Sequence, residues 1–253
     1  MNDFIGKVRL RLPTILFAAA LLGLWELLVQ VGVLSRAVFP SPTNIVRAIP
    51  ATITPLLEVI PQTLASAGIG FAISAAIAFF VAMLMDRFTI VARAVKPLLI
   101  ITQAVPIFAI APMFVIWFGF GVTPKVIVVT LICTFPILIG LYEGITSVRE
   151  DMLNYMRCIN ASYIQTFWHL KLPASVPSLF SGLKIAGTYC VTGAVIGEWL
   201  AGDGGLGTLM MRYKNAFRYS NMFVVIVAIC LLSLAVYYLI TLLKVIIQRK
   251  NKW

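Results

Sequence analysis

Charged residues are scarce in this chain. Only 11% of its 253 residues are Asp, Glu, Lys or Arg, whereas 61% are hydrophobic. A soluble domain carries roughly 25% charged residues, so a chain of this composition cannot cover its apolar surface with polar groups. The composition therefore excludes an ordinary soluble domain and predicts that most of the chain lies in lipid.

Histidine and cysteine are also rare. The chain has one histidine, His169, and four widely spaced cysteines, Cys133, Cys158, Cys190 and Cys230. Metal centres and disulfide frameworks need clustered ligands or regular pairs such as C-x-x-C, and this sequence has no such pair. We therefore expect no metal site and no cofactor.

Sequence motifs of catalysis and nucleotide binding are missing. The chain contains no G-x-x-x-x-G-K-[ST], H-E-x-x-H or G-x-S-x-G pattern. The glycine-rich stretch GDGGLG at 202–207 lacks the lysine of a phosphate loop, which predicts a turn. His169 has no Ser, Cys or carboxylate partner at a recognisable spacing. We therefore expect a chain that is not an enzyme and that has no energy source of its own.

Long apolar runs fill most of the sequence instead. A helix needs about 20 apolar residues to cross the hydrocarbon core. Six runs meet or approach that length, at 14–34, 63–85, 97–118, 126–145, 176–200 and 222–247. The pattern predicts an all-α, polytopic membrane protein with about six transmembrane helices. Pro106 and Pro112 interrupt the third run and predict a bend in it.

The distribution of basic residues predicts the orientation. If both termini lie inside, the inner segments carry more than twice as many Lys and Arg residues as the outer ones. The inner set is Lys7, Arg9, Arg11, Arg87, Arg93, Lys96, Arg149, Arg157, Lys171, Lys244, Arg249, Lys250 and Lys252, and the outer set is Arg36, Arg47, Lys125, Arg212, Lys214 and Arg218. The positive-inside rule therefore places both termini in the cytoplasm. The net charge of +11 then reflects basic loops beside anionic lipid and not nucleic-acid binding.

A turn and a helix are predicted after the first run. The sequence FPSPTN at 39–44 favours a helix start with Ser41 as N-cap and Pro42 at the first helical position. The amphipathic run at 45–60 follows, and we expect it to lie along the outer membrane interface.

Ionisable residues inside apolar runs are candidates for function, because they are costly in lipid. Glu26 and Glu143 lie near predicted helix ends, which favours an interfacial or capping role. Lys184 and Glu198 lie in the fifth run, 14 positions apart and thus about 21 Å apart along a helix. They therefore mark its two ends and cannot pair within it.

The fifth run has two different faces at 100° per residue. One face holds Lys184, Thr188, Val191, Thr192, Val195 and Glu198, and the opposite face holds Gly182, Ala186, Cys190, Gly193 and Gly197. The small face predicts close helix packing. The polar face is either the lining of a substrate path or a structural polar stripe. Gln103 of the third run could bond a solute or a neighbouring helix. The candidate pathway residues are therefore Gln103, Lys184, Thr188, Thr192 and Glu198.

A polar, amphipathic island interrupts the apolar sequence at 154–183. It predicts a short helix, a loop at Leu172-Pro173, a second proline at Pro177 and then the start of another apolar helix. Four of its side chains, Tyr155, Ile159, Phe167 and Trp168, are too apolar to all face water. The island therefore predicts a docking surface for a soluble protein.

The island resembles a known element. Its pattern R-x-x-[N/G]-A-S, followed by L-P-x-x-x-P-x-x-x-x-G-L, is similar to the cytoplasmic coupling loop, or EAA loop, of bacterial ABC-importer permeases. FPSPTNIV, APMFVIWFGFG and GEWLAGDGGLGTLM also occur in the order found there. Nearly the whole chain thus resembles the permeases of the nitrate, sulfonate and taurine group, whose relatives include riboflavin and thiamine-pyrimidine-precursor permeases.

The resemblance implies one transmembrane permease domain over 1–253, with a coupling loop at about 148–175. The ATPase-coupling residues implied are Asn154, Arg157, Asn160, Ala161, Ser162, Phe167, Leu172 and Pro173. This chain has Asn154-Tyr155-Met156 in place of E-A-A, so an ion pair of that glutamate with the ATPase is not available. Asn160 replaces a glycine, and asparagine tolerates the left-handed backbone better than most residues.

The resemblance also implies partners and a place in the cell. We expect a pair of permeases, as a homodimer, in the bacterial inner membrane. A cytoplasmic ABC ATPase dimer and an extracytoplasmic substrate-binding protein are the expected protein partners, and no nucleic acid is expected. The GEWL ending and the aromatic third run favour an aromatic heterocycle, such as a thiamine pyrimidine precursor or riboflavin, as substrate. The alternatives are a small anion (sulfonate, taurine or nitrate) or an intramembrane enzyme.

Overall fold

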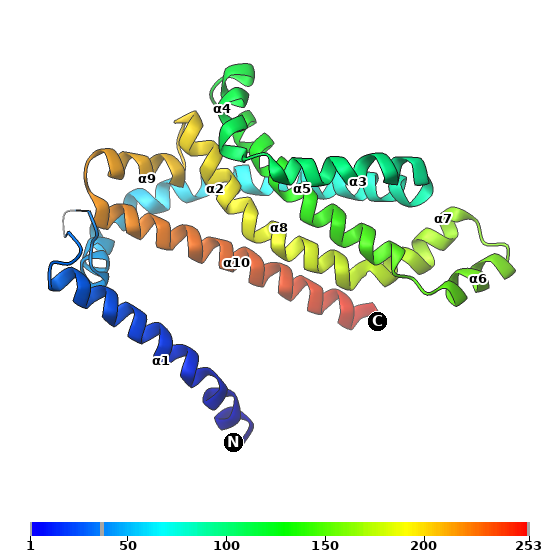
Figure 1. Ribbon diagram of the computed structural model, residues 1–253, viewed down its shortest axis with the longest axis horizontal. Helices are drawn as coiled ribbons and strands as arrows, with labels where there is room; N and C mark the ends of the chain where they lie inside the picture. The colour runs from blue at the N-terminus through cyan, green and yellow to red at the C-terminus, as the bar shows by residue number, and fades with distance from the viewer. Residues whose placement is uncertain (1, 36–37, 252–253) are drawn as a thin grey trace. The chain divides into compact units, whose positions relative to one another are not determined.

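The computed structural model describes residues 2–35 and 38–251, and every regular element within these ranges is a helix (Figure 1). The helices are α1 (Asn2–Gln30), α2 (Pro42–Arg87), α3 (Thr89–Ala104), α4 (Ile107–Phe118), α5 (Val122–Thr146), α6 (Glu150–Cys158), α7 (Tyr163–Thr166), the π-helix η1 (Phe167–Lys171), α8 (Leu172–Ala201), α9 (Leu206–Asn215) and α10 (Tyr219–Asn251). The predicted all-α class is confirmed. Arg36 and Lys252, which entered the charge count, lie outside the described residues.

Four helical stretches are long and apolar enough to cross a membrane. They are Pro42–Arg87, Val122–Thr146, Tyr163–Ala201 and Tyr219–Gln248. The bent pair α3 and α4 makes a fifth if it counts as one span, and the shorter apolar helix Leu16–Gln30 corresponds to the first predicted run. The polytopic membrane architecture is therefore confirmed.

The bend predicted in the third run lies at Pro106. Helices α3 and α4 meet there at 96°. Val105 has an extended backbone (φ −80°, ψ 121°), as the residue before a proline prefers, and Pro106 precedes α4 as its N-cap. Pro112, by contrast, lies inside α4 without ending it. The third run is thus two short helices around a corner.

Helix α2 contains both the amphipathic run at 45–60 and the second predicted span at 63–85. It begins at Pro42 as predicted, where the Ser41 hydroxyl accepts a bond from the Asn44 amide at 3.4 Å. It then continues to Arg87 as one helix of 46 residues. The amphipathic run and the second span are therefore parts of one helix, which continues through Pro50, Pro55 and Pro61.

The chain forms two compact units. The first consists of Met1–Glu58 and Leu209–Ala228, and the second of Val59–Thr208 and Ile229–Trp253. In the first unit, the Trp25 and Phe223 rings lie 5.8 Å apart. Glu26 accepts bonds from the amide and hydroxyl of Thr43, at 3.0 and 2.8 Å, in the first turn of α2. Glu26 thus caps a helix, as its place near a helix end suggested.

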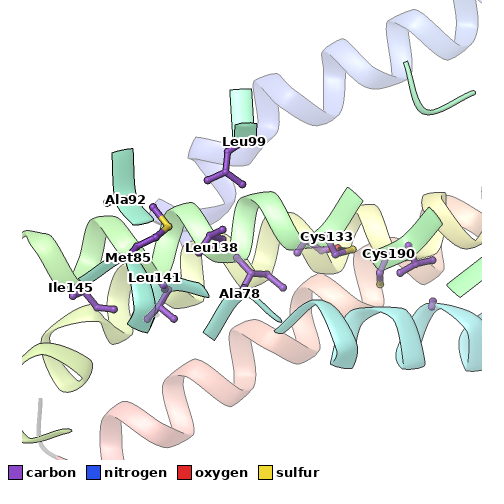
Figure 2. Close-up of a cluster of buried hydrophobic side chains, with 14 of the residues drawn as sticks. Ala78, Met85, Ala92, Leu99, Cys133, Leu138, Leu141, Ile145 and Cys190 are labelled. Atoms are coloured by element: carbon purple, nitrogen blue, oxygen red, sulfur yellow. Dashed lines mark hydrogen bonds between the residues drawn. The ribbon is translucent and has the colours of Figure 1, made fainter. Parts of the chain in front are cut away.

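The core of the second unit is built on α5 and α8. Its buried side chains include Cys133, Leu138, Leu141 and Ile145 of α5 and Cys190 of α8, with Ala78 and Met85 of α2 and Ala92 and Leu99 of α3 (Figure 2). Glycines let the two central helices approach closely. A Cβ atom on Gly144 would lie 2.7 Å from Ser175 Cα, and one on Gly193 would lie 3.3 Å from Val129 Cα. The close packing predicted for the small face of α8 is confirmed.

Candidate functional site

The coupling loop (148–175) forms a helix, a tight turn and a second helix. Helix α6 ends at Cys158, and the chain reverses through Asn160, whose φ of +51° is left-handed. Ser162 then starts α7 with a capping box. Its hydroxyl accepts from the Gln165 amide at 3.3 Å, and its own amide donates to the Gln165 side chain at 2.8 Å. The left-handed backbone that the sequence suggested at Asn160 is thus observed.

The loop exposes apolar side chains. Tyr155, Ile159, Ile164 and Trp168 are each more than half exposed, and Met152 is almost half exposed. Such a set on a polar segment is typical of a protein interface. The Asn154 side chain accepts a bond from Arg157 at 3.0 Å beside this surface, and Ala161 is half-buried.

Phe167 is placed differently from the other predicted docking residues. It is only 1% exposed and packs against Phe79 and Tyr163, with ring centroids 6.1 Å away in each case. Phe167 therefore anchors the coupling loop to the interior of the second unit and is not part of its exposed surface.

The predicted loop at Leu172-Pro173 is wrong. The chain passes from α7 through the π-helical turn Phe167–Lys171 directly into α8, where Pro173 occupies the first turn. Proline has no amide N–H to donate, and here it follows the π-helical turn that the Leu172 amide closes by donating to the Phe167 carbonyl. Single π-helical turns of this kind often lie at functional sites. The coupling loop is thus joined to α8 by continuous helix.

A cavity of about 1160 Å³ lies in the second unit. Its walls come from α3, the bend, α4, α5 and α8, with Ile77 from α2. The lining is mainly apolar and includes the aromatic residues Phe108, Phe135 and Tyr189. Its polar side chains are Thr102, Gln103, Thr130, Thr134, Glu143, Ser178, Ser181, Tyr189 and Thr192. Among the described residues that line the cavity, none is Lys, Arg or His.

The predicted pathway residues divide into two groups. Gln103 and Thr192 line the cavity, whereas Lys184, Thr188 and Glu198 do not. The Lys184 ammonium lies 5.6 Å from the centre of the Tyr237 ring of α10. The Thr188 hydroxyl donates to the backbone carbonyl of Lys184 at 3.1 Å. The polar face predicted for the fifth run therefore does not line the cavity as a whole.

A neighbouring face of α8 lines the cavity instead. It contains Ser178, Ser181, Ile185, Tyr189, Thr192 and Ile196, spaced three or four residues apart. The spacing of these residues is visible in the sequence. The polar side chains among them are uncharged, so they indicated a functional face less strongly than Lys184 and Glu198 did. Glu143 was the other omission, because its place near a helix end suggested a capping role.

Glu198 has a structural position. It is completely buried, and its Oε2 accepts a bond from the Gly207 amide at 2.9 Å, in the first turn of α9. The intervening glycine-rich stretch is the predicted turn, with left-handed backbones at Gly202, Gly204 and Gly205. The Lys125 ammonium donates to the carbonyl of Asp203 in the same turn. The positive end of the helix dipole also stabilises a carboxylate at the start of a helix.

Comparisons with known proteins agree with this arrangement. The family described as binding-protein-dependent transport system inner membrane component matches residues 68–253. The chain is 35% identical over 223 residues to the formylaminopyrimidine transport permease protein ThiX of Halalkalibacterium halodurans, covering 88% of each chain. It is 34% identical over 157 residues to the riboflavin transport system permease protein RibX of Chloroflexus aurantiacus, covering 62% of this chain and 59% of the relative.

A solved structure shares the fold. It is a crystal structure of an amino acid ABC transporter with histidines, with a TM-score of 0.63 and 14% identity, and it covers 78% of this chain and 96% of that chain. The resemblance stated from the sequence is thus confirmed, and the alternative of an intramembrane enzyme is not supported. Components of this family are multi-pass inner-membrane proteins that work with an ATPase and a substrate-binding protein. The chain belongs to this family of binding-protein-dependent transport components, as the permease subunit of an ABC importer whose ATP is hydrolysed by a separate subunit.

Proposed function

We propose that the cavity is the path by which an aromatic heterocycle, such as a thiamine pyrimidine precursor or riboflavin, crosses the membrane. The observation that carries this proposal is the character of the lining. It combines apolar walls and three aromatic rings with hydrogen-bonding groups such as Gln103, Thr192 and Ser181. Flat rings with polar edges suit such a surface. The names of the two relatives, for a formylaminopyrimidine and riboflavin, support the same class.

A small anion is the alternative substrate. Sulfonate, taurine or nitrate would need basic groups or many donors to replace water in a largely apolar cavity. The described lining has no basic residue and contains the carboxylate of Glu143, which repels anions. The lining therefore favours the heterocycle.

The coupling loop is the proposed docking site of the ATPase. Its exposed apolar side chains support this role, because they would be covered in the complex. We assign Asn154, Arg157, Asn160, Ala161 and Ser162 to the docking surface and its turn. Leu172, Pro173 and the buried Phe167 join that surface to the rest of the chain.

The proposed assembly contains two copies of this chain. Each copy is one permease domain over 1–253 with both termini in the cytoplasm, an orientation supported by the count of basic residues. An ATPase dimer binds the two coupling loops, and a substrate-binding protein delivers the solute from outside. ATP binding brings the coupling loops together and opens the path outward, and hydrolysis resets it.

Uptake by reconstituted complexes tests the substrate class. The full chain, its ATPase and the binding protein encoded beside it would be placed in vesicles with radiolabelled formylaminopyrimidine, riboflavin or taurine. We expect ATP-dependent uptake of a heterocycle and none of taurine. ATP-dependent uptake of taurine alone would overturn the proposal.

The substitution Ala161→Asp tests the docking role in the same vesicles. A charge buried at a protein interface costs about 2–5 kcal/mol, so the ATPase should dissociate and uptake should stop. Ala161→Ser is the control, because it keeps a small uncharged side chain. Normal ATPase stimulation by the Ala161→Asp variant would show that the loop does not dock there.

A further inference from the structure

The cytoplasmic end of α2, as oriented by the charge count, is fastened to the coupling loop by buried polar contacts. The Asp86 carboxylate receives the Lys171 ammonium at 2.6 Å on one oxygen and the Tyr163 hydroxyl at 3.0 Å on the other. Tyr163 is also 3.1 Å from the Met83 carbonyl. The side chains of Lys171 and Asp86 are only 16% and 6% exposed. We call Asp86, Tyr163 and Lys171 the clamp.

Aromatic contacts extend this attachment along α2. Phe79 lies seven residues before Asp86 on the same face of the helix. Its ring centroid is 6.1 Å from those of Phe167 and Trp168. The guanidinium of Arg87 lies 4.8 Å from the centre of the Tyr163 ring. The last two turns of α2 are therefore held along their length by α7 and η1.

The clamp makes a connection that the chain itself does not provide. The coupling loop is covalently continuous with α5 and α8, so any movement of the loop reaches those helices directly. Helix α2 is distant in sequence, because Asp86 and Lys171 are 85 positions apart. Besides packing in the shared core, the clamp is the direct polar link from α2 to the loop.

A buried ion pair is suited to this role. Its net contribution to stability is small, because desolvation of both charges offsets their attraction. Its geometry is nevertheless specific, since moving either partner leaves a buried charge unpaired. Lys171 also ends the π-helical turn, so the clamp holds an irregular part of the helix in one arrangement.

We propose that the clamp transmits movement of the coupling loop to α2 and so to the wall of the cavity. Ile77 of α2 lines that wall, nine residues before Asp86, or about 13.5 Å along the helix. The inference rests on the proposed docking of the ATPase at the coupling loop. Asp86, Tyr163 and Lys171 are positioning residues, which act through α2 and do not touch the solute.

The ratio of solute imported to ATP hydrolysed tests this role in the reconstituted full complex. The double variant Asp86→Asn/Lys171→Gln removes both charges together, so no buried charge is left unpaired. We expect the ATPase to remain bound and active while the ratio falls at least about fivefold, the lower end of typical coupling between sites. Tyr163→Phe, which keeps the ring and removes one bond, should lower the ratio less.

Two controls separate the clamp from general effects. Lys171→Arg keeps the charge and should keep most of the ratio, whereas Lys244→Met neutralises a lysine of α10 outside the clamp and should leave the ratio unchanged. An unchanged ratio in the double variant, with the ATPase bound, would overturn the inference. So would a loss of assembled complex together with a normal ratio in the complexes that remain, since that result indicates stability alone. Failure of the unmodified chain to bind the ATPase would instead refute the docking proposal itself.

Discussion

At the scale of single residues, the turn of the coupling loop depends on Asn160. Its φ of +51° belongs to the left-handed region, which β-branched side chains rarely enter. Asparagine can therefore take the place of the glycine expected from the coupling-loop pattern. The turn sets the angle between α6 and α7, and with it the shape of the exposed apolar surface.

Substitution of Asn160 should weaken coupling only where the new side chain resists the left-handed backbone. Asn160→Val should cost about 1–3 kcal/mol of local strain and lower ATPase stimulation by the reconstituted permease. Asn160→Gly should leave stimulation near that of the unmodified chain, because glycine adopts this backbone freely. Equal stimulation by both variants would indicate that the left-handed turn is not needed for docking.

Glu198 illustrates a limit of sequence reasoning about one residue. A carboxylate within an apolar run is equally compatible with a solute path and with a buried helix cap. The partner that decides between them is the Gly207 amide, nine positions later and beyond the glycine-rich turn. The conformation of that turn determines which group Glu198 reaches.

At the scale of helices, the pair α5 and α8 organises the second unit. Their close approach depends on glycines, because packing and not water expulsion drives helix association in lipid. The sequence predicted this from the small face of α8. The complementary glycines of α5, Gly140 and Gly144, are visible only as contacts with α8.

Filling one of these contacts should separate the helices. In Gly144→Ala the new methyl carbon would lie 2.7 Å from backbone and side-chain carbons of Ser175, and overpacking of this kind costs about 1–3 kcal/mol. Gly68→Ala is the matched control, since nothing lies within 4 Å of its new carbon. Thermal unfolding in detergent should show a lower midpoint for Gly144→Ala only. A similar loss in both variants would contradict the packing argument.

At the scale of the whole molecule, the proposed path must be reachable from water and must change with the transport cycle. Among the pathway candidates, Gln103 and Thr192 line the cavity and are exposed, whereas Glu198 is buried. Gly193, on the small face of α8, is also buried. Alternating access requires that exposure to each side of the membrane depend on nucleotide.

Cysteine labelling tests this in a chain from which Cys133, Cys158, Cys190 and Cys230 have been removed. Thr192→Cys and Gln103→Cys should react with a water-soluble maleimide, and their rates should change when ATP is trapped in the complex. Gly193→Cys should react slowly in both states, because its position faces Ile132 and Val129. Labelling of Thr192→Cys that ignores nucleotide, or rapid labelling of Gly193→Cys, would contradict the assignment of the path.

The sequence alone was enough to predict that most of the chain lies in lipid and that it is helical. It also predicted the helix start at Pro42, the bend at Pro106 and the small face of α8. Each follows from local properties, such as transfer of apolar residues to lipid, proline geometry and helical periodicity, which need no knowledge of neighbours. The patterns shared with importer permeases indicated the family for the same reason, since they are read along the chain.

Which polar groups meet depends on how the helices pack. The uncharged face of α8 lines the cavity, Lys184 faces a ring of α10, Phe167 lies in the interior, and Asp86 reaches Lys171. A helical pattern shows that residues share a face but not which helix covers that face. Such pairings join positions far apart in sequence, and they depend on how all the helices fill space together.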